Sequence, residues 1–217
     1  MNNDEYFTAL NPKLKELKHI RRTSNELAKC MIGNSLYEED LFFASVLNRS
    51  LSLLDGFVDM LENRNLACAG ILLRSQPDNC MRLYAAFIAQ DKRAFIRGFL
   101  EGKRISDFKD DRGVKMRDSV LRKRLETYDS RICEVYERTS GYVHLSGVAF
   151  HLGYQSIDDH NFGFSIGVPL KEEANKYLLE AAGAFIHYMK LLFFLLDAVV
   201  KSKERAENGE QPMHPTP

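Results

Sequence analysis

The sequence has few cysteines and no excess of either charge. Its four cysteines lie far apart and form no CxxC pair, so neither a zinc site nor a disulfide framework is expected (Cys30, Cys68, Cys80 and Cys133). Lys and Arg together number 30, as do Asp and Glu, and the net charge is zero. The whole molecule therefore lacks electrostatic attraction for nucleic acid or for an anionic membrane, and only a local basic patch can supply it.

Targeting signals and long hydrophobic runs are also missing. The first five residues, MNNDE, are polar and acidic, unlike a signal peptide. The most apolar stretch, residues 191–200, is shorter than a membrane span and contains Asp197. No repeat or linker divides the chain. We therefore expect a cytoplasmic protein without membrane contact, with one helical domain over residues 1–205 and a disordered tail over residues 206–217.

Several catalytic motifs are absent. The chain has no GxxxxGK(S/T) phosphate loop, no GxGxxG turn, no GxSxG elbow and no HExxH pair, which argues against the enzymes that depend on them. Three histidines and two aspartates lie between residues 144 and 160, but their spacing matches no common zinc or iron site (His144, His151, His160, Asp158 and Asp159). We expect neither a metal nor a cofactor.

Helical periodicity dominates what is present. It predicts helices over about residues 12–31, 37–62, 66–90 (kinked or interrupted near Pro77), 92–100, 118–139 and from just after Pro169 to about 203. Residues 148–155 and 161–168 are rich in Phe, Tyr and Val and predict a small hairpin. The expected fold is an all-α bundle of four to five long helices, with an extended insertion before the last helix.

The apolar stripe of the last predicted helix, which includes Tyr177, is typical of a bundle core, and His187 is expected to be a core histidine. Phe193 and Phe194 extend the apolar surface around this helix. Such a helix is either buried on several sides or packed against a second subunit.

Arg138 and His144, with five residues between them, are the most informative pair. On an unbroken helix their side chains would point about 120° apart, whereas a break at Gly141 would bring them together. A histidine can move a proton at the 2′-hydroxyl or at the leaving 5′-oxygen of RNA, and an arginine can hold the phosphate. In the structural alternative Arg138 pairs with Glu134, and His144 caps the helix or packs in a polar pocket.

Two further features bear on a polar site. Arg74, Asp78 and Arg82 recur every four residues in an apolar helix and form either a structural ion-pair ladder or a substrate contact. Residues 102–125 carry nine bases and four acids, with Phe108 as the only aromatic residue. This composition favours contact with phosphates over stacking on bases, although a solvated connector would look similar.

A helical bundle with R-x4–6-H near the end of a long helix resembles the HEPN superfamily. Residues 72–78, 82–84, 102–113 and 136–146 resemble a bacterial group of HEPN-like proteins. The resemblance implies a metal-independent endoribonuclease that works as a homodimer, with Arg138 and His144 as the catalytic pair. It also implies a setting in phage defence or a toxin–antitoxin system, with a partner protein encoded nearby.

Within the motif, Thr139 stands where active members commonly carry Asn, Asp or His. Thr139 or Ser140 would then donate a hydrogen bond to the phosphate, with Tyr142 beside them in the substrate site.

Two other functions fit the same sequence. One is a non-catalytic interaction or regulatory module, for which Arg138 and His144 should be buried or divergent. The other is a small-ligand-binding bundle, for which an enclosed pocket should surround Arg74. A ribonuclease instead requires Arg138 and His144 to converge, exposed, near a dimer cleft.

Overall fold

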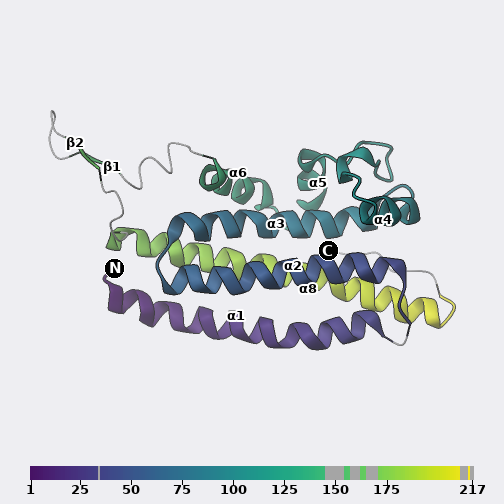
Figure 1. Ribbon diagram of the computed structural model, residues 1–217, viewed down its shortest axis with the longest axis horizontal. Helices are drawn as coiled ribbons and strands as arrows, with labels where there is room; N and C mark the ends of the chain where they lie inside the picture. Colours follow the sequence, from purple (N-terminus) through teal and green to yellow (C-terminus); the bar gives the residue numbers. More distant parts are fainter. Residues whose placement is uncertain (34, 145–153, 157–161, 165–170, 211–214, 216–217) are drawn as a thin grey trace.

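The computed structural model describes residues 1–33, 35–144, 154–156, 162–164, 171–210 and 215. The regular secondary structure of the described residues is helical, apart from one short strand pair and two isolated β-bridges. Four helices are long and span most of the molecule (Figure 1): α1 (Asn3–Ile32), α2 (Glu38–Glu62), α3 (Leu66–Ile88) and α8 (Asn175–Glu207). The shorter elements are α4 (Lys92–Leu100), η1 (Ile105–Asp107), α5 (Asp118–Leu125), α6 (Ile132–Val143) and η2 (Glu172–Ala174).

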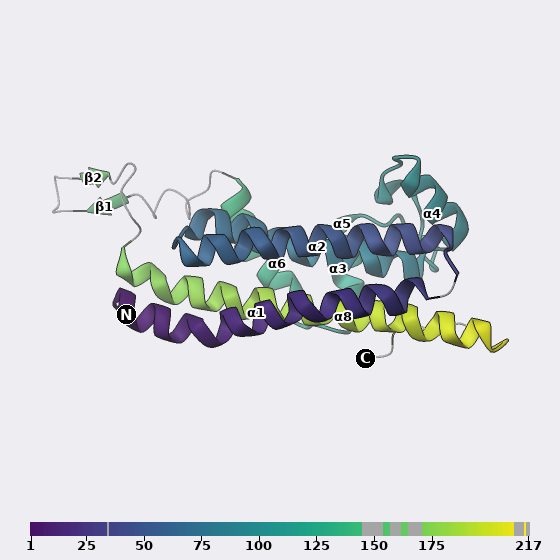
Figure 2. The ribbon, with the colours of Figure 1, turned by 60° about the horizontal axis from the view of Figure 1, so that its bottom comes forward.

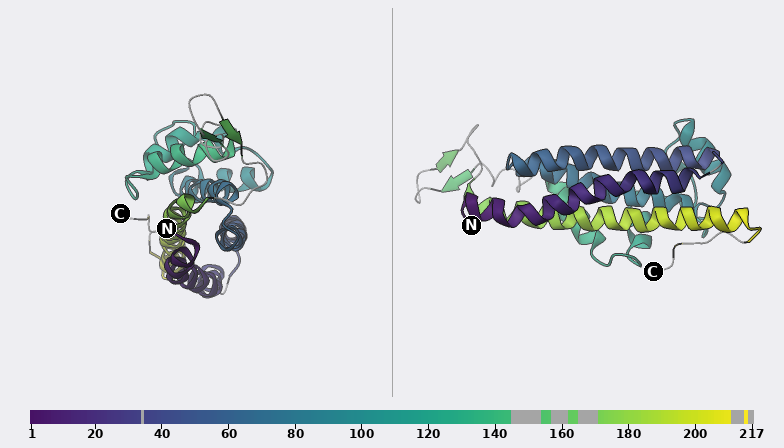
Figure 3. Two further views of the ribbon diagram at one scale, coloured as in Figure 1. Left: turned by 90° about the vertical axis from the view of Figure 1, so that its left-hand side faces the viewer. Right: turned by 90° about the horizontal axis from the view of Figure 1, so that it is seen from below.

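The long helices form a bundle in which α1 packs on α2 and α8, and α3 packs on the same two helices. In Figure 1, α1, α3 and α8 run in one direction and α2 runs in the other. The short helices α6, α5 and α4 form a separate layer over α3, which the end view in Figure 3 shows clearly. The all-helical prediction is thus confirmed, and the structure adds this outer layer to the four long helices.

Aromatic side chains connect the helices in the core. Phe57 of α2 stacks on Phe185 of α8, with ring centroids 4.2 Å apart. Phe42 meets Phe95 of α4 edge to face at 5.6 Å. The Tyr6 hydroxyl donates to the Leu61 carbonyl at 2.8 Å, and burial raises the pKa of this phenol to about 12. Because these rings come from helices far apart in sequence, the core holds α1, α2, α4 and α8 in one unit.

The first helix begins nine residues earlier than predicted. Asn2 accepts a hydrogen bond from the Glu5 N–H, and Glu5 accepts one from the Asn2 N–H, which forms a capping box. Pro12, predicted to start the helix, lies exposed within it. A proline there removes one backbone hydrogen bond, and the buried face of this 30-residue helix offsets that loss.

Two other helix predictions need correction. Helix α3 continues through Pro77 without interruption. The single helix predicted for residues 118–139 is two helices, α5 and α6. The turn between them contains Asp129, whose buried carboxylate accepts the Arg131 N–H at 3.2 Å and lies 3.3 Å from the His187 ring on α8. These contacts to another helix favour a turn that the local periodicity does not reveal.

Within the region predicted as a hairpin, β1 (Tyr154–Ser156) pairs antiparallel with β2 (Phe162–Phe164). The pair lies beyond the end of the bundle at which α1 and α8 begin (Figure 2). The rest of residues 148–168 lies outside the described residues. In the predicted disordered tail, residues 206 and 207 belong to α8, and the Pro215 carbonyl accepts a hydrogen bond from Tyr128 at 2.6 Å.

Two segments, Glu38–Glu62 and Glu172–Ala206, have the length and apolar composition of a membrane span. Both contribute residues to the bundle core, as apolar helices of globular proteins do.

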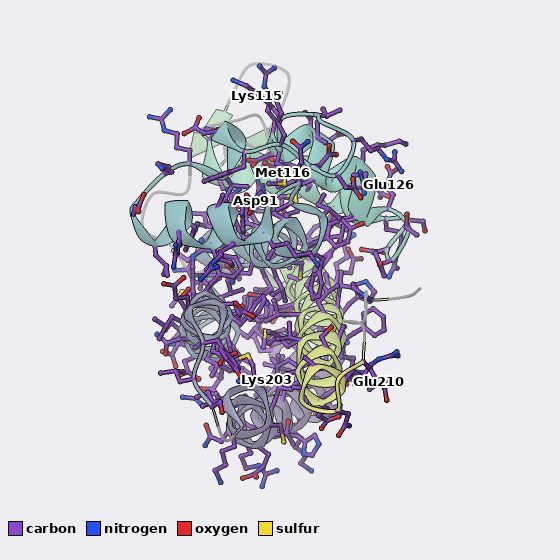
Figure 4. The ribbon with its side chains drawn as sticks, turned by 90° about the vertical axis from the view of Figure 1, so that its right-hand side faces the viewer. Asp91, Lys115, Met116, Glu126, Lys203 and Glu210 are labelled. Carbon is purple, nitrogen blue, oxygen red and sulfur yellow. The ribbon has the colours of Figure 1, made fainter. Side chains whose placement is uncertain are left out.

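A largely buried lysine, Lys203, joins the end of α8 to the start of α2. The Lys203 ammonium lies 2.6 Å from the carboxylate of Asp40, which is 1% exposed. It also donates to the carbonyls of Met31 and Ile32 at the end of α1 and of Ser35 in the connection to α2. Figure 4 shows Lys203 at this end of the bundle, between α1, α2 and α8. One ammonium therefore satisfies oxygens from three consecutive parts of the chain.

We expect Lys203→Met to lower the free energy of unfolding by about 3–5 kcal/mol, because it leaves the Asp40 carboxylate buried and unpaired. The matched control is Lys201→Met, which removes an exposed ion pair with Asp197 and should cost about 1 kcal/mol or less. Urea unfolding of both variants measures the difference. Equal losses would show that the Lys203 contacts contribute no more than a surface ion pair.

Candidate functional site

A largely buried arginine holds α6 on the bundle. Arg74 of α3 is 13% exposed, and its Nη1 donates to Asp78 Oδ1 at 3.1 Å. Its Nε donates to Ser140 Oγ on α6 at 3.3 Å. The guanidinium carbon lies 3.2 Å from the centre of the Tyr136 ring, also on α6. The charge is therefore compensated by a carboxylate, a hydroxyl and an aromatic face.

The ion-pair ladder continues from Asp78 into α5. Asp78 lies 3.8 Å from Arg82, and Arg82 Nη1 lies 3.1 Å from Asp118 Oδ1. The Tyr136 hydroxyl donates to the other Asp118 oxygen at 3.3 Å. Burial raises the pKa of Tyr136, which keeps this phenol protonated as a donor. Arg74, Asp78 and Arg82 are thus paired within the chain, as the ion-pair alternative expects.

A cavity of about 590 Å³ opens between α3, α6 and α8. Its floor is apolar (Leu66, Gly70, Leu73, Val135, Ala181 and Ala184). Its polar lining comes from α6 and the first turns of α8 (Arg138, Thr139, Tyr142, Tyr177 and Glu180). Apolar walls with a few polar groups at one side are typical of ligand-binding cavities. Arg74, around which a small-ligand bundle would require an enclosed pocket, does not line this cavity.

The Arg138 side chain lies at this cavity with two-thirds of its surface exposed. Its Nη1 is 3.5 Å from Glu134 and its Nη2 is 3.9 Å from Glu180, and both carboxylates are themselves exposed. The Glu134 pairing is the one expected for a purely structural arginine. Exposed ion pairs of this length contribute little, so the guanidinium can leave them for a phosphate at small cost.

Glycine 141 does not break the helix. Helix α6 continues through it to Val143, and exposed His144 is the C-cap, with its backbone N–H donating to the Ser140 carbonyl at 3.3 Å. The break at Gly141 that would bring Arg138 and His144 together is therefore not present. Both residues are exposed on one helix, and in the described part of the chain no hydrogen bond or ion pair joins their side chains.

The hydroxyls of Thr139 and Ser140 are already engaged. Thr139 Oγ1 donates to the Val135 carbonyl at 2.6 Å, and the residue is buried. Ser140 Oγ donates to the Tyr136 carbonyl at 2.7 Å while accepting from Arg74. Each hydroxyl has one proton to donate, so neither is free to donate to a phosphate in this structure. The role expected for these two residues is therefore not supported by their geometry.

Tyr142 packs its ring directly over Gly70 of α3. A Cβ added at Gly70 would come within 3 Å of three ring carbons. Burial raises the pKa of Tyr142, and the nearby Arg138 partly counters that effect. Close approach of α6 to α3 at this point thus requires the glycine.

Sequence reasoning missed the contribution of α8. Tyr177, expected to be a core residue, is 43% exposed and lines the cavity together with Glu180. His187, also expected in the core, is partly exposed beside Asp129. Burial alone raises the pKa of Asp129, but the neighbouring His187 and Tyr188 lower it more, and the net pKa is below its usual value. The sequence pattern of the last helix predicts neither the position of Tyr177 at the cavity nor the contact of His187 with Asp129.

Among the residues that the structure describes, no cluster of three His, Cys, Asp or Glu side chains could hold a metal ion. His151, His160, Asp158 and Asp159 lie outside the described residues.

No protein-family model matches the sequence, and no curated protein or solved structure matches it either.

We expect Gly70→Ala to lower the free energy of unfolding by about 1–3 kcal/mol, because the new methyl group overlaps the Tyr142 ring. Gly56→Ala in α2 is the matched control. Its Cβ would meet only Leu72 at an ordinary 3.6 Å, and the higher helix propensity of alanine should stabilise the protein by up to about 1 kcal/mol. Thermal or urea unfolding compares the two. Stabilisation by both substitutions would contradict the close packing of α6 on α3.

Proposed function

We propose that the chain is a metal-independent endoribonuclease whose active site lies on α6, beside the cavity between α3, α6 and α8. One observation carries this proposal. The Arg138 guanidinium is exposed at a cavity of about 590 Å³ and makes long ion pairs with Glu134 and Glu180, on the same helix whose C-cap is the exposed His144. An exposed guanidinium and an exposed imidazole are the types of group that RNA cleavage uses. Because the two side chains do not converge within one chain, the proposal requires them to meet across the interface between two copies of the chain.

In the proposed reaction the 2′-oxygen attacks the adjacent phosphorus, and the bond to the 5′-oxygen breaks. The products are a 2′,3′-cyclic phosphate and a 5′-hydroxyl. His144 accepts the 2′-hydroxyl proton or donates a proton to the leaving oxygen, and Arg138 stabilises the additional negative charge on the phosphate oxygens. One imidazole cannot accept the 2′-hydroxyl proton and protonate the leaving oxygen at the same time. His144 of a second copy of the chain would therefore perform the other proton transfer. This is the homodimer that the HEPN resemblance implies.

The cavity suits an unpaired base next to the cleaved phosphate. Its apolar floor and the rings of Tyr142 and Tyr177 are surfaces on which a base can stack, an interaction worth about 1–3 kcal/mol per base. The biological setting implied by the resemblance belongs to the same proposal: a cytoplasmic phage-defence or toxin–antitoxin protein with a partner encoded nearby.

A non-catalytic interaction module is the second candidate. It is favoured by the pairing of Arg138 with two carboxylates and by the apolar floor of the cavity, which would also accept an apolar side chain of a partner protein. In that case Arg138 and His144 would be dispensable for any activity on RNA.

The test is cleavage of a mixed RNA pool in EDTA. We expect His144→Ala to lower the rate about 10²–10⁴-fold, because a general acid–base group is lost. Arg138→Ala should lower it about 10²–10³-fold, since it removes charge stabilisation in the transition state. The matched controls are His19→Ala and Arg22→Ala on α1, both exposed, and both should cleave like the wild type.

The ends of the products decide the mechanism, and 2′,3′-cyclic phosphates are expected. Cleavage that survives in both α6 variants would assign the activity to another site or to a contaminant. A complete lack of cleavage by the folded wild-type protein would contradict the ribonuclease and leave the interaction module.

A further inference from the structure

The connection between α4 and α5 contains a loop that is fixed by a buried carboxylate. Asp110 is 1% exposed, and its Oδ1 accepts the backbone N–H groups of Arg112 and Val114 at 3.0 and 2.8 Å. Its Oδ2 lies 3.0 Å from Arg124 of α5. Gly113 completes the turn with a positive φ of 76°. A carboxylate with these partners holds the loop in one conformation.

The same loop is anchored on the end of α3. The Asp111 N–H donates to the Ile88 carbonyl at 2.7 Å, and the Gln90 N–H donates to the Lys109 carbonyl at 3.0 Å. Lys109 and Lys115 form a β-bridge, and the next residue, Met116, is fully buried. The loop is therefore part of the rigid framework of the bundle.

This rigid loop displays cations that have no ion-pair partner among the described residues. Five side chains are exposed and make no ion pair with any described residue (Arg104, Lys109, Arg112, Lys115 and Arg117). The nearby acids offset them only in part: Asp110 and Asp111 share one cation, Arg124, and Asp107 is exposed on the same connection. We call these five residues the basic loop. It is a local positive patch on a molecule whose net charge is zero.

The basic loop and the α6 site share the outer layer over α3. Tyr142 packs over Gly70 near the start of α3, and the loop is anchored at Ile88 at its end. Gly70 and Ile88 are 18 positions apart, which corresponds to about 27 Å along the helix. Figure 1 shows α6, α5 and α4 in order along α3, and Figure 4 shows Lys115 at the edge of this layer farthest from α1.

We propose that the basic loop is a second RNA contact, which binds phosphates of the backbone at a distance from the cleaved bond. This inference rests on the proposed function for its choice of polyanion. Cationic side chains on a rigid loop bind phosphates without the entropic cost of ordering that loop. The half-buried Phe108 is the only aromatic side chain in residues 102–125, so the contact reads charge and not base sequence.

The same surface fits other polyanions less well. Val114, 47% exposed, is the one large apolar side chain exposed on the loop itself, too little to insert into a bilayer.

A span of about 27 Å from the α6 site corresponds to about eight nucleotides at a helical rise of 3.4 Å, so a single RNA molecule reaches both contacts.

The test is binding of a fluorescent 20-nucleotide 2′-O-methyl RNA, which cannot be cleaved through its 2′-oxygen. We compare the wild type with Arg112→Gln/Lys115→Gln over a series of salt concentrations. Losing two phosphate contacts should reduce the magnitude of the log–log salt slope by about 1.4 and weaken binding at least about tenfold at low salt. Lys15→Gln/Arg22→Gln on α1, an equally exposed pair, is the matched control and should bind like the wild type.

Unchanged binding by the loop variant, equal weakening by both variants, or no RNA binding by the wild type would overturn the proposal. Loop-dependent binding to phosphatidylserine vesicles or to polyglutamate that is tighter than binding to RNA would also overturn it. Because the probe is not cleaved, loop-dependent RNA binding in a protein without nuclease activity would refute the proposed function while leaving the RNA contact standing.

Discussion

The arrangement of the outer layer depends on the buried guanidinium of Arg74. A charge removed from water must be compensated, and three helices supply what it needs: Asp78 on α3 itself, Ser140 and Tyr136 on α6, and Asp118 on α5 through Arg82 and Tyr136. The short helix α6 has only 12 residues and would be marginal alone. Its position, and with it that of the α6 site, follows from satisfying one charge on α3.

Local signals in the sequence predicted the helices well where no tertiary contact competes. The bounds of α2, α3 and α4 follow from periodicity and from acidic or polar residues at their starts. The start of α1 lies before the predicted one at Pro12, because the capping box of Asn2 and Glu5 begins the helix at Asn3. The break before α6 could not be predicted, because Asp129 is held by His187, 58 residues later in the chain.

The candidate site shows the same limit. Four-residue spacing identified Arg74, Asp78 and Arg82 as neighbours, but the choice between ladder and substrate contact depends on Asp118 and Tyr136, which local patterns do not place nearby. Tyr177 and Glu180 of α8 line the cavity, and local patterns do not predict this placement either. Gly141 permits a break in α6, yet the helix continues through it. A glycine is tolerated in a helix that packing holds in place, and here Arg74 contacts Ser140 and Tyr142 packs over Gly70.

The central claim is that RNA lies on the outer layer of the bundle, from α6 to the basic loop. Hydrogen–deuterium exchange with and without saturating uncleavable RNA tests it most directly. The account predicts slower exchange in peptides that cover α6 and residues 103–117, with α1 unchanged. Protection confined to α1 or to other parts of the bundle, or no protection at saturation, would contradict it.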